Sequence, residues 1–369
     1  MNTLFVLSQI ELTGAETYAV SLIKALQNKG YKLAIVSDTL NSPIEVPYYP
    51  LDMDNRKSLF NRLRHIKQLC QIIKQKKIDI LHAHSRASSW VAYFASRIAK
   101  IPLVTTAHCI YPVHLSRKIM PCFGEEIIAV CGAVKEHLVR DLNVKSEKVF
   151  LIPNGIDLQR FKPDIDCASV KEEFRGSSQK RIISWVGRFS GPRGRLIEEM
   201  VEKVFPEVLR IIPDICFLIV GGGIAPSSLM AKVEVINQQS GQAVIRWTGL
   251  RNDLPQIYAL SDLVIGAGRV TLEAMACTRP VIAVGENKFV GLISPQTIED
   301  GIYTNFGDCC PYQPTDWKEL TQAIVHLLKN KKEFVELGRW GRTVVEERFD
   351  MRKVADKVEE VYEKTLDNK

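Results

Sequence analysis

The stretch that most constrains the fold is Asp262–Val284, which carries the pattern of a strand, a glycine turn, a helix and a second strand. A short apolar run ends at Gly266 and Gly268, and Val270–Cys277 then has helical periodicity. Such a unit belongs in a parallel sheet covered by helices. A helix that begins at the glycine-rich end of a strand can bind an anion with its free N–H groups.

Glu273 lies one turn inside this expected helix, and two interpretations of it stay open. A carboxylate in such a site does not favour phosphate, but it can accept hydrogen bonds from sugar hydroxyls, as acidic residues do toward ribose. Alternatively, the helix is a core helix whose Glu273 is solvated or caps a backbone group.

The segment that starts at Glu273 reads Glu-Ala-Met-Ala-Cys-x-x-Pro-Val-Ile-Ala. It resembles the donor-site motif of family 4 of the retaining, nucleotide-sugar-dependent glycosyltransferases, which have the GT-B fold. In that family two glutamates stand eight positions apart, and the second, matched by Glu273, binds the ribose of the donor. Ile265 occupies the position of the first, which normally lies near the donor sugar. Arg269 and Thr278 replace an aliphatic residue and a glycine of the family pattern.

The composition is that of an ordinary globular protein with room for two domains: 369 residues, 46% hydrophobic and 25% charged. The first residues have no basic region before their short apolar run, so we expect a first strand there and no signal peptide. No apolar stretch is long enough to cross a bilayer.

The sequence has nine scattered cysteines and no Cys-x-x-Cys pair, so it indicates neither a zinc site nor a disulfide framework. Free cysteines are typical of a reducing compartment, so we expect the protein in the cytoplasm. Two Asp-x-Asp matches in loops, at 52–54 and 164–166, are uninformative, and we expect no metal.

The N-terminal strand, Leu4–Ser8, leads through a loop into an amphipathic helix and a second strand. The loop contains Thr-Gly-Ala-Glu, which resembles the family's Gly-Gly-Ala-Glu. The resemblance implies that Gly14 lets the backbone approach the donor and that Ala15 and Glu16 lie on the acceptor side. An ordinary Rossmann turn is the alternative. The three spaced glycines of a dinucleotide-binding turn are not present.

Two groups of histidines follow expected strands: His82 and His84 after Ile78–Leu81, and His108 after Pro102–Thr106. The carboxyl ends of parallel strands are where open α/β sheets bind ligands. The resemblance implies that His108 lies at the active centre and that His84 is on the acceptor side. Packing histidines are the alternative, and without a third ligand nearby the metal signal is weak.

The second half begins with a strand, Ile182–Val186, followed by a loop with three arginines in eight residues. Glycines, a helix start and guanidinium groups together favour an anion. The loop resembles the family's Gly-Arg-Leu…Lys-Gly. Gly187 and Arg188 match it and Arg193 replaces the lysine, which implies that both arginines hold the donor diphosphate. A solvated loop is the alternative.

Two later strands also end in glycine turns, and we expect Gly222 and Thr248 in these turns to lie at the donor site. Thr248 stands in a segment that resembles the family's loop around the nucleotide base.

A basic segment, Arg56–Lys77, contains no acidic residue. Its apolar residues recur at helical spacing: Leu59, Leu63, Ile66, Leu69 and Ile73. Such a helix can lie on an anionic membrane, where each cation contributes about 1 kcal/mol. The alternative is a domain helix whose apolar stripe faces its own sheet while the charges are solvated, and the two are compatible. Because aromatic residues are not interleaved with the charges, we expect no nucleic-acid partner.

The resemblance covers nearly the whole chain in order, so we predict an α/β GT-B protein of two facing, Rossmann-like, doubly wound domains with an interdomain cleft. The expected domains are residues 1–165, joined by a terminal helix at about 350–369, and residues 178–349. Between them, Val149–Asp157 matches the family's interdomain motif. After Val284 the chain departs from the family's Gly-Gly-x-x-Glu, which together with Ile265 suggests a divergent branch with a rebuilt sugar pocket.

The expected activity is transfer of a sugar, with retention, from a nucleotide-diphosphate donor to a hydroxyl of a lipid-linked or glycan acceptor. Among the donors we expect a UDP-sugar. Such transfer belongs to cell-envelope polysaccharide or glycolipid synthesis. No cofactor or metal is expected, because Arg188 and Arg193 would stabilise the leaving diphosphate in place of a metal and His108 would sit at the reacting centre. The basic helix would place the protein at the inner face of the membrane. The alternatives are a non-catalytic nucleotide-sugar-binding subunit and a sugar-nucleotide epimerase of the same fold.

Overall fold

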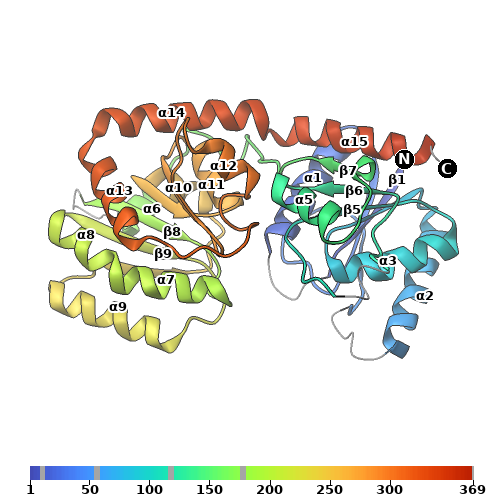
Figure 1. The fold of residues 1–369 in the computed structure, drawn as a ribbon, viewed down its shortest axis with the longest axis horizontal. Coiled ribbons are helices and arrows are strands. Elements are labelled where there is room, and N and C mark those ends of the chain that lie inside the picture. Colours follow the sequence, from blue (N-terminus) through green and yellow to red (C-terminus); the bar gives the residue numbers. More distant parts are fainter. Residues whose placement is uncertain (9–12, 54–58, 115–119, 175–179, 368–369) are drawn as a thin grey trace. The chain divides into compact units, whose positions relative to one another are not determined.

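The computed structural model describes residues 1–8, 13–53, 59–114, 120–174 and 180–367, in two compact units. The first unit consists of Met1–Gly155 and Phe349–Lys369, and the second of Ile156–Arg348. The short segment after Gly155, which the sequence assigned to the first domain, therefore belongs to the second unit. Each unit is an α/β layer structure built on one sheet (Figure 1).

The first unit contains a seven-stranded parallel sheet in the order β3-β2-β1-β4-β5-β6-β7. Neighbouring strands β1 and β4 are the point at which the strand order reverses, and such a point is where open sheets of this kind bind ligands. The strands are β1 Asn2–Val6, β2 Lys32–Ser37, β3 Tyr48–Pro50, β4 Ile80–Ala83, β5 Leu103–Ala107, β6 Glu126–Ala129 and β7 Val149–Leu151.

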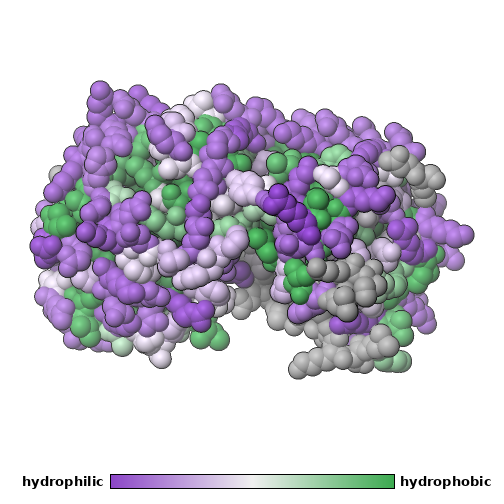
Figure 2. Space-filling view, viewed as in Figure 1, coloured by the Kyte–Doolittle hydropathy of each residue, from purple (hydrophilic) through white to green (hydrophobic). Residues whose placement is uncertain are grey.

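Helices cover both faces of this sheet because its strands are apolar on both sides. Helices α1 and α15 share one apolar core with it, while α2 and α3 share the other. The terminal helix α15 thus packs on the first unit, with Val358 and Tyr362 fully buried. The outer surface of this helix is mainly hydrophilic, as is that of α14, Lys331–Arg348 in the second unit (Figure 2). The helices are α1 Gly14–Gln27, α2 Leu59–Lys76, α3 Arg86–Ala99, α5 Gly132–Arg140, η1 Ser146–Lys148 and α15 Met351–Asp367.

The predicted stripe on α2 is partly wrong. Ile66, Leu69 and Ile73 are buried in the core, but the side chain of Leu63 is 57% exposed. Leu63 lies before the part of the helix that faces the sheet, so spacing alone assigned it to the wrong face. The side chain of Leu59, together with residues 54–58, lies outside the described residues. Among the helices that the structure describes, none is long and apolar enough to cross a membrane.

The second unit contains a six-stranded sheet in the order β10-β9-β8-β11-β12-β13. Its strands are parallel except β13, which runs antiparallel to β12. The strand order reverses between β8 and β11, and the predicted strand–turn–helix–strand unit is present as β11, α11 and β12. The strands are β8 Arg181–Val186, β9 Ile215–Val220, β10 Ile245–Gly249, β11 Leu263–Gly266, β12 Val281–Val284 and β13 Phe289–Leu292.

The helices of the second unit pack on both sides of this sheet (Figure 1). Helices α7, α8, α9 and α13 contribute to a large apolar core that includes Trp185, Phe217 and Ile265. The helices are α6 Ala168–Phe174, α7 Pro192–Lys203, α8 Phe205–Ile211, α9 Ser227–Ser240, α10 Leu254–Leu260, α11 Arg269–Ala276, α12 Ile298–Tyr303, α13 Trp317–Lys329 and α14 Lys331–Arg348.

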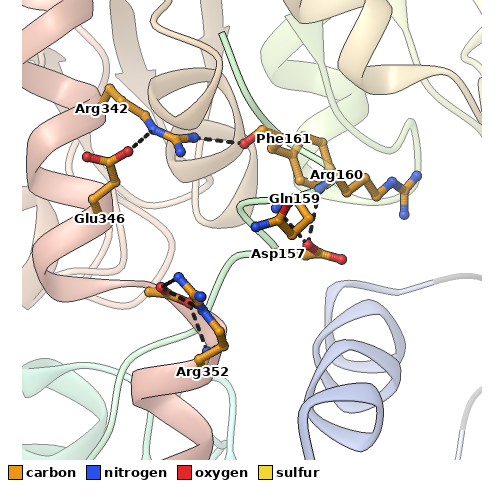
Figure 3. A network of polar contacts seen from close by, with 8 residues as sticks. Asp157, Gln159, Arg160, Phe161, Arg342, Glu346 and Arg352 are labelled. Atoms are coloured by element: carbon orange, nitrogen blue, oxygen red, sulfur yellow. Dashed lines mark hydrogen bonds and ion pairs between the residues drawn. The ribbon is translucent and has the colours of Figure 1, made fainter. Parts of the chain in front are cut away.

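The chain that enters the second unit is held by polar contacts (Figure 3). Asp157 Oδ1 accepts hydrogen bonds from two backbone N–H groups, Gln159 at 3.0 Å and Arg160 at 3.1 Å, which closes a tight turn. Arg342 on α14 donates to the carbonyl of Phe161 at 2.9 Å and to that of Ala276, at the end of α11, at 2.8 Å. The entering segment is therefore tied to the helix that follows the strand-order reversal.

Candidate functional site

The loops that follow β8, β11 and β12 converge at the carboxyl edge of the second sheet. Gly268, the N-cap of α11, has a positive φ of 56°, which favours glycine. A Cβ added there would lie 3.0 Å from Asp308 Oδ2 and 3.4 Å from Asn305 Nδ2. Polar side chains therefore stand directly over the start of α11.

Arg193, in the first turn of α7, makes two ion pairs at this edge. Its Nε lies 2.7 Å from Glu286 Oε1 and its Nη2 lies 2.7 Å from Asp308 Oδ2. The charge of Asp308 is the main cause that raises the pKa of the guanidinium. The structure places Arg193 at this edge of the sheet but pairs it with two carboxylates, so a diphosphate bound there would compete with them for the guanidinium charge.

Asp308 lies directly after an unusual turn, which positions its side chain. Asn305, Phe306 and Gly307 all have positive φ, at 51°, 57° and 93°. Left-handed backbone at non-glycine residues costs free energy and persists only where the surroundings hold it. Here the buried Phe306 ring anchors the turn, and the carbonyl of Gly307 accepts hydrogen bonds from the N–H groups of residues 287 and 288, both at 3.1 Å. Asp308 and Glu286 were not among the residues predicted from the sequence, where the only signal for them is the departure from the family pattern after Val284.

Arg188 differs from Arg193 in its surroundings. It is half-buried, and its guanidinium makes no hydrogen bond or ion pair with any residue that the structure describes. The third arginine of the loop, Arg195, is exposed on α7. Arg188 is thus a partly desolvated cation, free to take an anion, in the glycine loop beside the strand-order reversal.

The glycines of this edge allow close packing of backbone and side chains. A Cβ on Gly187 would lie 2.7 Å from the Trp185 ring, and one on Gly266 would lie 2.3 Å from a methyl carbon of Val270. Gly222 accepts a hydrogen bond from the N–H of the residue two after Gly187 at 3.0 Å, which joins the two glycine loops. Thr248 donates its hydroxyl to the carbonyl of the next residue at 3.0 Å. These positions shape the edge, and the Thr248 hydroxyl is already used within the loop.

Glu273 is only 5% exposed, so the interpretation as a solvated acid is wrong. Tyr258 donates its hydroxyl to Glu273 Oε2 at 3.0 Å, and Arg269 Nη2 lies 3.2 Å from Oε1. Burial, followed by the charge of Glu273, raises the pKa of Tyr258 well above its usual range. The carboxylate is therefore held rigidly by two donors. Ile265 is fully buried in the apolar core and supplies no polar group.

In the first unit, the three predicted histidines come together at the ends of β4 and β5. His84 Nδ1 lies 3.4 Å from His108 Nε2. The His82 ring bonds the Tyr362 hydroxyl at 2.6 Å and the Thr106 hydroxyl at 2.7 Å. Burial lowers the pKa of His82 to about 3 and that of His84 well below its usual range. His82 and His84 are therefore neutral at physiological pH, while His108 is half-buried.

The Thr-Gly-Ala-Glu turn opens α1 at the neighbouring strand β1. Glu16 is fully buried, and its carboxylate accepts hydrogen bonds from the backbone N–H groups of Asn41 at 2.8 Å and Ser42 at 2.7 Å. It holds the loop after β2 in place. Gly14 is exposed and Ala15 is half-buried, so an acceptor contact from this turn would fall to these two residues.

Two doubly wound units, each with its candidate residues at the carboxyl edge of its sheet, are the architecture of the GT-B fold. The family models agree: Glycosyltransferase Family 4 matches residues 12–160 and Glycosyl transferases group 1 matches residues 180–330. The chain therefore belongs to the group 1 glycosyltransferases of family 4.

Several proteins similar to this chain are glycosyltransferases. The UDP-Gal:alpha-D-GlcNAc-diphosphoundecaprenol alpha-1,3-galactosyltransferase of Escherichia coli is 24% identical over 97% of this chain and 95% of its own length. A glycosyltransferase structure from Rickettsia africae ESF-5 is 24% identical, with a TM-score of 0.81 over 100% of this chain and 99% of its own. Anabaena HepE, solved in complex with UDP-glucose, is 19% identical, with a TM-score of 0.76 over 99% and 100%.

Proposed function

We propose that this glycosyltransferase transfers a sugar with retention from a UDP-sugar to a hydroxyl of a lipid-linked or glycan acceptor in cell-envelope polysaccharide or glycolipid synthesis. The observation that carries the proposal is Arg188, a half-buried cation without a partner among the described residues, in a glycine loop at the strand-order reversal. Among the relatives, the Escherichia coli enzyme uses a UDP-sugar and a diphosphoundecaprenol acceptor, which supports the choice of donor and acceptor class.

The proposed roles follow from charge and hydrogen-bonding capacity. Arg188 binds the diphosphate and stabilises the charge that develops on it as the sugar leaves, so no metal is needed for that purpose. Glu273, already fixed by Arg269 and Tyr258, accepts hydrogen bonds from the ribose hydroxyls. The leaving phosphate helps to take the proton of the acceptor hydroxyl on the same face of the sugar. This route retains the anomeric configuration without a protein nucleophile.

The test is a panel of UDP-, GDP- and ADP-sugars, measured for binding by calorimetry and for slow hydrolysis in the absence of acceptor. We expect one UDP-sugar to bind and to be hydrolysed slowly, because the half-buried Arg188 stabilises the leaving diphosphate even when water is the acceptor. Binding of a GDP- or ADP-sugar alone would refute the choice of donor. No binding of any member would contradict the proposal as a whole.

A second candidate function is a non-catalytic nucleotide-sugar-binding subunit, and it is favoured by Ile265, which puts a buried apolar side chain where the family has a carboxylate. In the same panel it would give donor binding without hydrolysis, and addition of an acceptor extract would not change that result. An epimerase of the same fold would release free nucleotide without any acceptor and would convert the sugar at the same time.

We further propose that α2 holds the enzyme at an anionic membrane surface. Phe60 is 74% exposed and Leu63 is 57% exposed, and these two large apolar side chains lie on the same face as the exposed cations Arg64, Lys67 and Lys74. The helix has no acidic residue and stands beside α3 in the first unit (Figure 1). Apolar side chains that enter the headgroup region next to cations are typical of helices that lie on a membrane.

Replacing both apolar side chains, Phe60→Ser with Leu63→Ser, is expected to reduce binding to vesicles that contain phosphatidylglycerol. Neutralising Lys74, Lys76 and Lys77 is expected to reduce it as well, since each cation near an anionic surface contributes about 1 kcal/mol. Co-sedimentation with vesicles of phosphatidylcholine, with and without phosphatidylglycerol, measures both effects.

The matched control is to neutralise three exposed cations of the second unit, Lys329, Lys331 and Arg339, with the same change in net charge. This variant should bind the vesicles like the unaltered protein. If all variants bind equally, the face of α2 is merely solvated and the proposed membrane contact is wrong.

A further inference from the structure

The histidine cluster of the first unit has one feature that the proposed function does not use. The side chain of His84 is buried, with an exposed fraction of 1% for the residue. Its ring stacks on Phe5 at a centroid distance of 5.2 Å and an interplanar angle of 9°, and it lies 4.1 Å from the His82 ring. Nδ1 faces His108 Nε2 at 3.4 Å, whereas Nε2 has no hydrogen-bond partner in the described part of the chain.

A neutral imidazole carries one proton on one of its two nitrogens, and the other nitrogen is an acceptor. If the proton of His84 were on Nε2, a buried N–H would lack an acceptor in the described part of the chain and would bear its full desolvation penalty. If the proton is on Nδ1, it is donated to His108, and only a lone pair is left without a partner. Orphaned buried N–H groups are rarer in proteins than acceptors with an unused lone pair. The surroundings of His84 therefore favour the proton on Nδ1.

His82 does not compete for this proton. Both of its ring nitrogens are engaged by hydroxyl groups, those of Tyr362 and Thr106. Burial lowers the pKa of His84 well below its usual range, so the ring carries a proton on only one of its two nitrogens. His108 also packs against the Tyr18 ring in a T-shaped arrangement at a centroid distance of 5.3 Å, which restricts the orientation of its ring.

We propose that His84 donates its Nδ1–H to His108 Nε2 and so fixes His108 as the tautomer protonated at Nδ1. His84 is then a positioning residue for His108. This rests on the proposed function and gives His108 a definite chemical capacity. Its Nδ1 carries the proton and its Nε2 lone pair accepts from His84, so His108 has no lone pair left with which to take the proton of the acceptor hydroxyl. That proton must then go to another group, in agreement with a role for the leaving phosphate.

The tautomers are measured directly by two-bond ¹H–¹⁵N correlation spectra of the full chain labelled with ¹⁵N-histidine. We expect both His84 and His108 to show a protonated Nδ1 and an unprotonated Nε2 at neutral pH. The signals are assigned from their loss in the variants His84→Asn and His108→Asn. A His108 that is protonated at Nε2, or at both nitrogens, would overturn the inference.

Two substitutions at position 84 separate donation from packing. The amide nitrogen of His84→Asn lies close to the place of Nδ1 and can still donate, so the His108 tautomer should be kept. His84→Leu fills the site without a donor, and His108 should shift toward the tautomer protonated at Nε2. An unchanged His108 spectrum in His84→Leu would show that another group sets the tautomer and would refute the inference.

The signals of His137, which is buried in the first unit with Nδ1 2.7 Å from Asp141 Oδ2, serve as an internal reference for the fold. If His84→Leu does not fold, His84→Gln provides the second variant, because its amide reaches the place of Nε2 and leaves Nδ1 unreplaced. These spectra need no substrate. Failure of the sugar-nucleotide panel would contradict the proposed function alone, whereas a wrong His108 tautomer would contradict the inference alone.

Discussion

Arg188→Ala is expected to lower the rate of sugar transfer by at least about 10²-fold, on the scale of removing one preorganised donor from a site of developing negative charge. The guanidinium has no partner among the described residues, so its removal should leave the free energy of unfolding nearly unchanged. The measurement is the initial rate of transfer, or of donor hydrolysis where no acceptor is known, with the unfolding midpoint recorded alongside.

Arg195→Ala is the matched control, because Arg195 is an exposed arginine that follows the same loop. It should keep the rate within about twofold, as expected for a surface substitution away from the site. If Arg188→Ala keeps full activity, the proposed role of this residue in diphosphate binding is wrong. Equal losses in both variants would point to a general effect of positive charge and not to a specific contact.

Arg193 provides a less direct test of the same role. Its alanine variant would leave Glu286 and Asp308 without their shared cation at a partly buried edge. A fall in activity could then come from two unpaired carboxylates as well as from a lost phosphate contact. Arg188 is therefore the residue whose removal reports on the diphosphate most simply.

The sequence was sufficient to predict the elements around the second site because their pattern is local. The strand–turn–helix–strand unit follows from apolar runs and two glycines, and the arginine loop follows from the end of a strand. The meeting of His84 and His108 also follows from a simple rule, since neighbouring parallel strands bring their carboxyl ends to one edge.

The sequence could not predict the partners of the charged groups. Asp308 stands 115 residues after Arg193, in a turn whose left-handed backbone has no regular period. Likewise, Glu16 is bound by the backbone of Asn41 and Ser42, groups that every residue carries and that no motif identifies. Both cases depend on how loops from distant parts of the chain meet, which is decided by tertiary packing.

The surroundings of Glu273 change how its proposed role can be tested. Its side chain is 7% exposed and that of Arg269 is 9% exposed, so the two form a buried ion pair. Glu273→Ala would break this buried ion pair and is expected to lower the free energy of unfolding by about 3–5 kcal/mol. The alanine variant alone could therefore confuse a loss of donor binding with a loss of structure.

Glu273→Gln is the sharper variant because it keeps the side-chain volume and an acceptor for the Tyr258 hydroxyl while removing the charge. If the carboxylate binds the ribose, calorimetry with UDP should show an affinity weaker by about 1–3 kcal/mol, the range for hydrogen bonds to a charged group. The sugar part of the donor should not matter, so UDP and the UDP-sugar should be affected alike.

Tyr258→Phe is the control for the structural part of this effect. It removes the hydrogen bond to Glu273 Oε2 and keeps the carboxylate, so it should cost about 1 kcal/mol of stability with little change in UDP affinity. If Tyr258→Phe weakens UDP binding as much as Glu273→Gln does, both act by disturbing the edge of the site. If Glu273→Gln binds UDP with full affinity, Glu273 serves only to hold Arg269 and the start of α11, and the ribose must be bound by other groups.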